Sequence, residues 1–344
     1  MRILITGGAG MVGSHAAERF AQQGDEVVVL DNLMRSKLFG SSKESVEYNW
    51  TYLERYPNVS RIRGDVRSEE DVRRALGSGV DAVIHAAGQP GVGLSMRLPK
   101  EDFSINAQGT LTLLECVRDV SPKAALVFCS TNKVYGENVE RLRLRKKKTR
   151  YEYAGTRAID ETMPIDRTGH TPYGASKYVA DLYVQEYAHS YGMRTAAFRM
   201  SCIYGTRQFG FEDQGWVAWF VIAAMKGFPL TIYGDGRQVR DVLFVTDLVA
   251  AFERFIRGGR RSGVYNIGGG GKNTLSLLEL LKMLEERLSK KIPVSFADWR
   301  PSDQKVYISD ISKARRELGW SPRVRVGEGV DHLVEWARRH ADLF

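Results

Sequence analysis

The stretch from residue 2 to residue 31 constrains the possible fold more than any other part of the sequence. An apolar run at residues 2–6 leads directly into the glycine turn Gly7-Gly-Ala-Gly10-Met-Val-Gly13, and an amphipathic segment and a second apolar run ending at Asp31 follow. Glycines at this spacing allow a tight turn and let backbone N–H groups approach a pyrophosphate at the start of a helix. The stretch therefore predicts the strand, turn, helix and acid-tipped strand of a dinucleotide-binding unit.

The acid at the end of the second apolar run indicates which dinucleotide binds. A carboxylate here would accept hydrogen bonds from the hydroxyls of an adenosine ribose and would repel a 2′-phosphate, so Asp31 favours NAD over NADP. Arg35 could instead pair with such a phosphate. We interpret Arg35 as a surface arginine and predict NAD as the cofactor.

Further short apolar runs alternate with helical segments along the chain. These runs, each predicted to be a strand, are residues 59–62, 81–85, 125–130, 195–200 and 264–267. Such alternation predicts an α/β fold with a doubly wound parallel sheet, the Rossmann arrangement, covered by helices on both faces. We predict a cofactor-binding domain at residues 1–200, completed by about 237–267, and a smaller, mostly C-terminal α/β lobe for the substrate at 201–236 and 268–344. His85 lies inside an apolar strand, so we interpret it as a core residue.

Composition narrows the class of protein further. No apolar run in the 344 residues approaches the ~20 that a membrane-spanning helix needs. Cys116, Cys129 and Cys202 are far apart and lie in apolar contexts, which favours reduced thiols in the cytoplasm over a disulfide framework. No His/Cys spacing suggests a metal site.

A dense basic run is the most unusual feature of a chain whose net charge is +9. Residues 141–150 read Arg-Leu-Arg-Leu-Arg-Lys-Lys-Lys-Thr-Arg, which is typical of a solvated loop or edge; a positive rim that attracts a phosphorylated ligand is the alternative. No nucleic-acid-binding motif accompanies the run, so we expect no nucleic-acid partner. The polar stretch 137–162 around it predicts either a flap near the substrate or a disordered surface insertion.

Tyr173-Gly-Ala-Ser-Lys177 suggests acid/base chemistry. In a helix, residues four apart share one face, so the phenol and the ammonium would lie together. A tyrosine titrates near ~10, and a nearby ammonium favours the phenolate and lowers that value. The pair could therefore move a proton on and off a sugar hydroxyl.

Together these motifs resemble the extended short-chain dehydrogenases/reductases that act on nucleotide sugars. The resemblance rests on the glycine turn, on Ser130-Thr131-Asn132-Lys133-Val134-Tyr135-Gly136 and on the Tyr173/Lys177 pair, and it implies a Thr131, Tyr173 and Lys177 triad. Asp213-Gln214-Gly215-Trp216-Val217 and Ser302-Asp303-Gln304 narrow it to the CDP-tyvelose (CDP-paratose) 2-epimerases. Trp216 and Trp219, at helical spacing, we interpret as core residues.

The resemblance also implies binding residues. Those for the cofactor are Gly7, Gly10, Met11, Val12, Asp31, Asn32, Asp65, Val66, Ala87, Gly88, Asn106, Tyr173 and Lys177. Those for the nucleotide sugar are Gln89, Asn132, Arg207, Gln214, Arg240, Arg300 and Asp303. Arg240 and Arg300 are cationic forks suited to a diphosphate, with a surface salt bridge as the alternative. For Asp65, a cap of a turn or helix is the alternative.

The implied reaction is a redox-neutral inversion at C2 of a nucleotide-diphosphate sugar. Tyr173 would take the hydroxyl proton while NAD takes the hydride, Lys177 would hold the phenolate and the nicotinamide ribose, and Thr131 would orient the hydroxyl. A 4-epimerase is the runner-up, although Pro90 and Cys202 depart from the UDP-sugar 4-epimerase pattern. A 4,6-dehydratase would need an acid and a base where this chain has Asn132 and Lys133.

A non-catalytic NAD-sensing or RNA-binding module is the alternative from another class, and the intact triad argues against it. The resemblance further implies a homodimer or homotetramer. Subunits would pair through the helix Tyr173–Tyr191, whose Tyr178, Leu182 and Tyr187 form a second apolar face.

Overall fold

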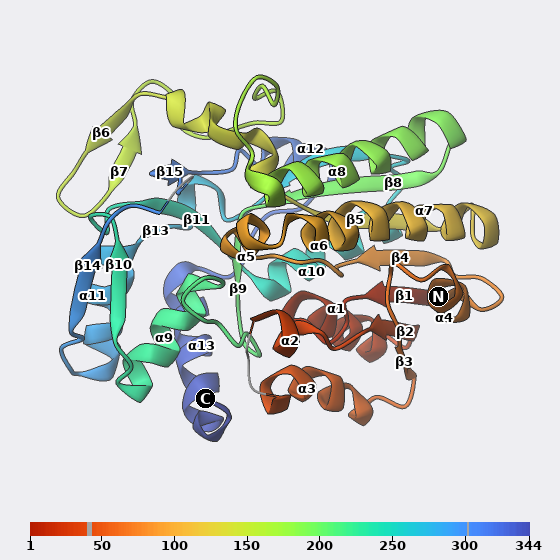
Figure 1. The fold of residues 1–344 in the computed structure, drawn as a ribbon, viewed down its shortest axis with the longest axis horizontal. Coiled ribbons are helices and arrows are strands. Elements are labelled where there is room, and N and C mark those ends of the chain that lie inside the picture. The colour runs from red at the N-terminus through yellow and green to blue at the C-terminus, as the bar shows by residue number, and fades with distance from the viewer. Residues whose placement is uncertain (40–42, 301–302) are drawn as a thin grey trace.

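A seven-stranded parallel sheet forms the centre of the computed structural model, which describes residues 1–39, 43–300 and 303–344 (Figure 1). Its strands run in the order β12-β8-β5-β4-β1-β2-β3. Their bounds are β1 Arg2–Thr6, β2 Glu26–Asp31, β3 Val59–Arg63, β4 Ala82–His85, β5 Ala125–Thr131, β8 Arg194–Met200 and β12 Gly263–Ile267. Each lies where the sequence predicts a strand, and the doubly wound α/β class is confirmed.

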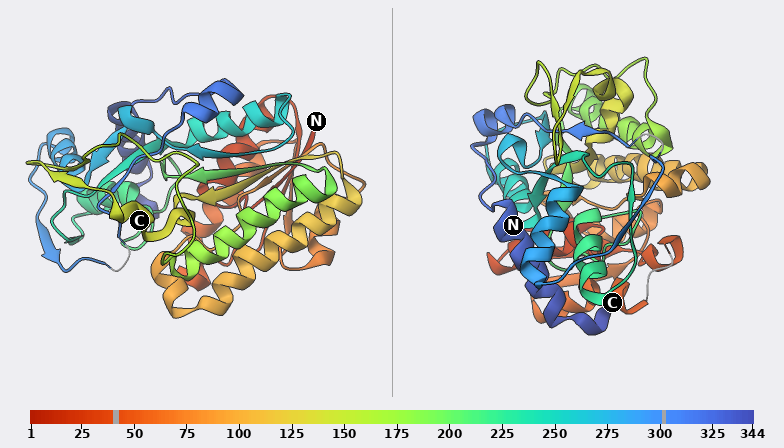
Figure 2. Two further views of the ribbon diagram at one scale, coloured as in Figure 1. Left: turned by 90° about the horizontal axis from the view of Figure 1, so that it is seen from above. Right: turned by 90° about the vertical axis from the view of Figure 1, so that its left-hand side faces the viewer.

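Helices cover both faces of this sheet (Figure 2, left). On one face lie α1 Met11–Gln22, α10 Val245–Arg257 and α12 Ser312–Leu318; on the other lie α4 Glu69–Leu76, α7 Gly109–Val120 and α8 Thr171–Tyr191. Successive strand residues point to opposite faces. Ile3 and Ile5 therefore pack with the first set of helices and Leu4 with the second. Shorter helices are α2 Arg35–Phe39, α3 Lys43–Tyr52, α5 Val92–Arg97 and α6 Pro99–Phe103, with 3-10 segments at Leu53–Arg55, Asn132–Arg141, Gly270–Lys272 and Ala341–Leu343 and a π-helical segment at Ser104–Gln108.

A second, smaller group of elements has a hydrophobic core of its own. Strand β11 Val239–Phe244 pairs with β9 Cys202–Tyr204, β13 Thr274–Ser276 and β15 Val306–Tyr307, and β10 Leu230–Tyr233 pairs with β14 Val294–Ala297. Helices α9 Trp216–Lys226, α11 Leu277–Leu288 and α13 Val326–Arg339 pack with these strands. This group corresponds to the smaller lobe that the sequence predicts for the substrate, and we call it the substrate lobe.

The two groups interleave more than the predicted boundaries imply. Within 237–267, β12 joins the central sheet but β11 joins the substrate lobe. The C-terminal segment returns the other way, because Ala314 and Trp320 belong to the core of the central sheet and the Trp320 Nε1 donates to the Asp247 carbonyl at 2.8 Å.

Most of the basic run lies in an exposed β-hairpin, which agrees with the predicted solvated edge and differs from a disordered insertion. Strands β6 Leu144–Lys146 and β7 Tyr151–Tyr153 pair antiparallel and project beside the substrate lobe (Figure 1). The hairpin is fixed there because the Arg150 Nε donates to the Glu279 carboxylate at 2.8 Å and the Ser276 hydroxyl donates to the Thr149 carbonyl at 2.8 Å.

His85 is a core residue, as the sequence predicts. Its ring nitrogens lie 2.7 Å from the Thr6 hydroxyl and 2.9 Å from the Thr110 hydroxyl. Burial, with a smaller effect of Lys177, lowers the pKa of His85 to about 3, so the ring is neutral. None of the helices in the described ranges combines the length and the apolar character that crossing a bilayer requires.

Candidate active site

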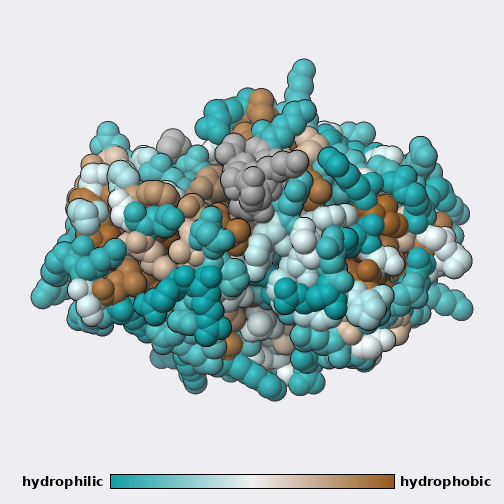
Figure 3. All heavy atoms as spheres, turned by 90° about the horizontal axis from the view of Figure 1, so that it is seen from below, coloured by the Kyte–Doolittle hydropathy of each residue, from teal (hydrophilic) through white to brown (hydrophobic). Residues whose placement is uncertain are grey.

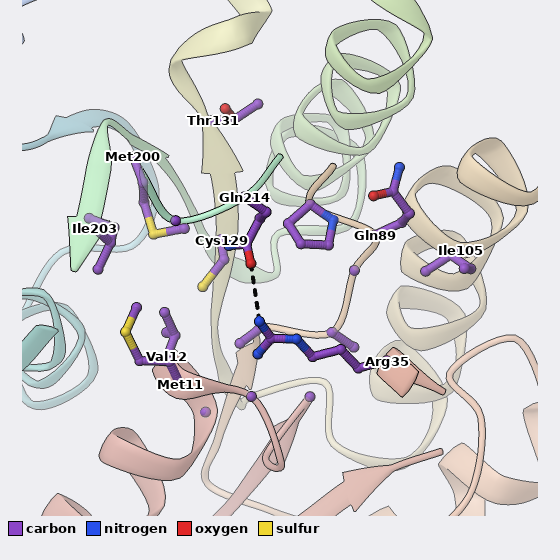
Figure 4. Close-up of a pocket in the computed structure, with 18 of the residues that line it drawn as sticks. Met11, Val12, Arg35, Gln89, Ile105, Cys129, Thr131, Met200, Ile203 and Gln214 are labelled. Atoms are coloured by element: carbon purple, nitrogen blue, oxygen red, sulfur yellow. Dashed lines mark hydrogen bonds between the residues drawn. The ribbon is translucent and has the colours of Figure 1, made fainter. Parts of the chain in front are cut away.

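A cavity of about 480 Å³ opens where the carboxyl ends of β1, β2, β4 and β5 meet. Figure 4 shows Met11 and Val12 on one side of it, Gln89 and Ile105 on the other, and Thr131 at the end of β5. The predicted residues that line it are Gly7, Gly10, Met11, Val12, Asp31, Asn32, Asp65, Val66, Ala87, Gly88, Gln89, Thr131, Asn132, Tyr173, Lys177, Gln214 and Arg240. The cavity therefore brings the predicted triad and the glycine turn together, at the edge where doubly wound sheets bind ligands.

The glycine turn touches the loop that follows β4. Gly7 has a φ of +73°, and a Cβ on it would lie 2.5 Å from the Ala87 nitrogen. Gly10 precedes α1 as its N-cap without a side-chain cap, and the first turn of α1 contains no acidic residue. The positive end of the helix dipole is therefore open to a negatively charged group in the cavity.

Two carboxylates border the cavity beyond this turn. The Asp31 carboxylate accepts hydrogen bonds from the backbone nitrogens of Ala9 at 2.9 Å and Leu33 at 2.8 Å, and burial raises its pKa. Asp65 accepts from the Asn32 amide at 2.9 Å and forms an ion pair of 2.7 Å with Arg67. Asp65 also accepts from the Arg67 backbone nitrogen at 2.9 Å, so it both stabilises a turn and lines the cavity.

Arg35 is not the surface residue that we expected. It lines the cavity, and its guanidinium donates to the Phe209 carbonyl at 2.5 Å and to the Gln214 side chain at 3.3 Å (Figure 4). Burial lowers the pKa of Arg35 to about 10. The partners of Arg35 thus belong to a loop of the substrate lobe on the other side of the cavity. This loop is far from Arg35 in the sequence, so no local pattern predicts the contact.

The triad combines α8 with the end of β5. Thr131 is the last residue of β5, and Tyr173 and Lys177 lie one turn apart on α8. Burial raises the pKa of Tyr173 to about 12, a hydrogen bond with the Thr131 side chain opposes this, and burial lowers the pKa of Lys177 to about 8. The expected lowering of the tyrosine pKa by Lys177 is absent here, because burial is the largest effect on both groups.

A buried ion pair holds α8 against the sheet. Asp181, two turns beyond Tyr173, pairs with Arg199 of β8 at 3.0 Å and accepts a hydrogen bond of 2.5 Å from the Ser130 hydroxyl, next to Thr131. Arg199 also donates to the Tyr135 hydroxyl at 3.3 Å. Asp181 is not among the residues predicted from the sequence, although a carboxylate four residues after Lys177 on an apolar helix face is a detectable signal.

Asn106 and Arg207 do not line the cavity. Asn106 is buried behind the β4 loop, where its side-chain oxygen accepts from the Gln89 nitrogen at 2.9 Å. Arg207 is buried too, paired with Glu18 at 2.7 Å and 4.1 Å from the Tyr52 ring centroid. Both side chains are already engaged inside the protein, which explains why they point away from the ligand space.

The predicted phosphate-binding arginines are both in salt bridges. Arg240 lines the cavity and pairs with Asp303 at 2.6 Å, which keeps Asp303 itself out of the lining. Arg300 pairs with Asp213 at 3.0 Å and lies 3.8 Å from the Tyr233 ring centroid, outside the lining. Ser302 of the same motif lies outside the described residues.

The part of the cavity toward the substrate lobe is more apolar than the sequence predicts. Met200, Cys202, Ile203 and Trp216 line it, and the Trp216 Nε1 donates to the Cys202 sulfur at 3.0 Å. Trp216, expected in the core, therefore faces the ligand space, whereas Trp219 stacks on Phe228 at 6.2 Å. Among the described residues, no group of His, Cys, Asp and Glu has an arrangement that could hold a metal.

Comparison with known proteins decides the family. The NAD dependent epimerase/dehydratase family matches residues 3–268. The chain belongs to this family. It is 38% identical to the CDP-paratose 2-epimerase of Salmonella typhi over 98% of this chain and 99% of that protein.

Solved structures agree with this membership. The UDP-glucose 4-epimerase of Thermus thermophilus in complex with NAD is 32% identical, with a TM-score of 0.81 over 99% of this chain and 100% of that one. The dTDP-glucose 4,6-dehydratase of Streptomyces venezuelae, with NAD bound, is 30% identical, with a TM-score of 0.84 over 100% of this chain and 99% of that one. The protein is thus similar to NAD-dependent enzymes of nucleotide sugars with different reactions.

The contact between Gly7 and Ala87 yields a prediction with a matched control. Gly24 also has a positive φ, +82°, but a Cβ there meets nothing within 4 Å. Gly24→Ala should cost about 1–2 kcal/mol for the left-handed backbone alone. Gly7→Ala should cost a further ~1–3 kcal/mol, because the methyl group overlaps backbone, and should weaken NAD binding. Urea unfolding and NAD titration of both variants would test this; equal losses in both would contradict the proposed contact.

Proposed function

We propose that this enzyme inverts C2 of a nucleotide-diphosphate sugar. CDP-paratose and CDP-tyvelose are the first candidate substrates, and GDP- or CDP-linked glucose and mannose are further ones. The observation that carries the proposal is that Thr131, Tyr173 and Lys177 line one cavity together with the glycine turn. The near-full-length similarity to a CDP-paratose 2-epimerase supports the choice of C2.

The residues around the glycine turn fit NAD. The uncapped start of α1, with Met11 and Val12, would hold the pyrophosphate, Asp31 the adenosine ribose, and Asp65 and Val66 the adenine end. Lys177, Ala87 and Gly88 border the remaining space, where the nicotinamide half would lie. When bound, NAD would accept a hydride from the sugar carbon and return it to the other face.

The protein side of the reaction is proton transfer at the Tyr173 hydroxyl. The Thr131 hydroxyl lines the same cavity as that phenol and would orient the sugar hydroxyl toward it. Lys177, one turn away on the same helix and in the same cavity lining, would hold the nicotinamide ribose. The same tyrosine would return the proton when the hydroxyl is restored.

Two related reactions remain as alternatives. A 4-epimerase would use the same triad, and several relatives have that activity in their names. A 4,6-dehydratase also needs an acid and a base to eliminate water, but the positions after Thr131 are Asn132, hydrogen-bonded to Gln304 at 3.3 Å, and Lys133, whose pKa burial lowers to about 8. Neither position offers a carboxylic acid, so the dehydratase is the weaker alternative.

We also propose that the protein lies in the cytoplasm, where the free thiols of Cys116, Cys129 and Cys202 would stay reduced. We further propose that it forms a homodimer or homotetramer whose subunits pair through α8. Leu182 is 45% exposed on α8 and Phe103 is 52% exposed on the neighbouring α6. Tyr187, predicted on this face, is instead buried and donates to the Glu115 carboxylate. Figure 2 (left) shows α8 and α7 side by side at the surface, whereas the opposite face in Figure 3 is mostly hydrophilic.

Removal of the phenolic hydroxyl tests the proton transfer. Tyr173→Phe keeps the ring and its packing, so NAD content and nucleotide-sugar binding should be unchanged while kcat falls by roughly 10²-fold or more. Turnover would be followed by NMR of the sugar and bound NAD by absorbance after denaturation. Wild-type turnover in this variant would remove Tyr173 from the mechanism.

A panel of CDP-, GDP- and UDP-hexoses labelled with deuterium at C2 tests the position of inversion. The expected product is a C2 epimer that retains its label. In a redox-neutral exchange the hydrogen bonded to C2 leaves as a hydride and returns to the same carbon, so it is not exchanged with water. Proton NMR shows both the inverted carbon and the label. Inversion at C4 would assign a 4-epimerase instead, and entry of solvent hydrogen at C2 would contradict the redox mechanism.

Substitution on α8 tests the assembly. Leu182→Glu should shift a dimer toward monomer in light scattering, because it places a charge in an apolar contact. Phe296→Glu is the matched control, since Phe296 is 59% exposed but lies on β14 of the substrate lobe. A wild-type protein that stays monomeric at every concentration would contradict the proposed pairing.

A further inference from the structure

A buried carboxylate lies behind the triad and outside the cavity lining. Asp102, at α6, is 1% exposed. It accepts hydrogen bonds from the Gln89 side-chain nitrogen at 2.7 Å, the Asn106 side-chain nitrogen at 3.1 Å and the Ser176 hydroxyl. None of the expected substrate, cofactor or catalytic roles uses this residue.

The contacts of Asp102 fit an ionised carboxylate. The Gln89 and Asn106 amide nitrogens can only donate, so both require an acceptor at Oδ1, and the Ser176 hydroxyl can donate to the second oxygen. Burial raises the pKa of Asp102, and the hydrogen bonds of Ser176 and Gln89 oppose that rise. A buried negative charge is costly unless hydrogen bonds and an opposite charge compensate it.

Ser176 connects this carboxylate to the catalytic turn of α8. Its hydroxyl lies 3.1 Å from the Tyr173 carbonyl oxygen, and the residue directly precedes Lys177. The backbone nitrogen of Tyr173 donates to the Ser95 hydroxyl at 3.1 Å, which fixes the same turn from α5. Through Gln89, whose amide also donates to the Gly91 carbonyl at 2.9 Å, Asp102 holds the loop that borders the cavity after β4.

The titratable groups around the pair come from several elements. Those that act on Lys177 are Asp102 of α6, Cys129 of β5 and Asp181 of α8, with His85 of β4 also near it. Tyr173 faces Thr131, Asp102 and Cys129. Asp102 is therefore the carboxylate that acts on both members of the pair.

We propose that Asp102 is a positioning residue for the Tyr173–Lys177 pair, tying the catalytic turn of α8 to the Gln89 loop and supplying the negative charge that faces both residues. This inference rests on the proposed function in one respect, because the effect on kcat is measured with the proposed epimerisation. The contacts themselves are independent of the substrate.

The sign of the effect follows from the charge. The Asp102 carboxylate raises the pKa of Tyr173 and that of Lys177. Without this charge both values fall. The phenolate would then form at lower pH and the ammonium would be lost at lower pH, so both limbs of the pH profile of kcat/KM should move toward acid.

Asp102→Asn and Ser176→Ala together test the proposal. Asp102→Asn keeps the shape, removes the charge and turns one acceptor into a donor; kcat should fall about 10- to 100-fold and both limbs should shift to lower pH. Ser176→Ala keeps the Asp102 carboxyl and removes the link to the turn, together with the Asn106 contact of the same hydroxyl, so kcat should fall while the limbs stay. Both variants should retain NAD, because neither residue lines the cavity.

Two outcomes would overturn the inference: unchanged kcat in Asp102→Asn, or reduced kcat with an unshifted profile, which packing alone would produce. The pKa of Tyr173 can also be measured without turnover, from the ultraviolet absorbance of its phenolate as the pH rises. Subtracting the absorbance of the same protein carrying Tyr173→Phe removes the signal of the other tyrosines. The midpoint of this titration should fall in Asp102→Asn and stay in Ser176→Ala, even if the wild-type protein epimerises none of the sugars. Failure of the proposed function and failure of this inference are thereby separable.

Discussion

The buried ion pair between Asp181 and Arg199 is the interaction on which the arrangement of the triad depends. Its carboxylate is also hydrogen-bonded to Ser130, so one group joins α8, β8 and the end of β5. Loss of one partner of a buried pair leaves a charge without compensation and typically costs about 3–5 kcal/mol. The register of α8 against β5, and with it the approach of Tyr173 to Thr131, is thus fixed by a contact outside the cavity.

The loop after β4 connects the two halves of the site. Ala86 and Ala87, at the start of the loop, lie against Gly7, where only a glycine fits. A Cβ on Gly88 would lie 3.0 Å from the Asn106 side-chain oxygen and 3.7 Å from the Lys177 side-chain nitrogen. The same loop continues into Gln89, which Asp102 holds. The glycine turn, the β4 loop and Lys177 therefore form one contiguous packing unit, and a shift in any part of it would move the others.

The sequence predicts the central sheet well because parallel strands buried on both faces read as short apolar runs. The substrate lobe offers no such signal: β15 has only two residues, and β11 pairs with β9 and β13 from distant parts of the chain. The same limit applies to side chains. The triad and the glycine turn lie in local motifs, whereas Arg35, Arg207 and Trp216 acquire their positions from long-range partners, Phe209, Glu18 and Cys202. A charge read as free in the sequence can be neutralised by a carboxylate that only the fold brings near.

The choice of sugar carbon does not reside in the triad. In the proposed mechanism Thr131, Tyr173 and Lys177 would act on any hydroxyl that reaches the Tyr173 oxygen, and solved relatives with different reactions share the fold at TM-scores of 0.81 and 0.84. Selection must therefore come from where the nucleotide is held relative to Tyr173 and from the walls between them. In this chain those walls include Met200, Cys202 and Trp216, which present few hydrogen-bonding groups, while Arg240 is held by Asp303. Under the proposed function, a diphosphate that displaces the Asp303 carboxylate from Arg240 would set the position of the sugar against that wall. The wall and Arg240 would then select the sugar carbon, and α8 would transfer the proton.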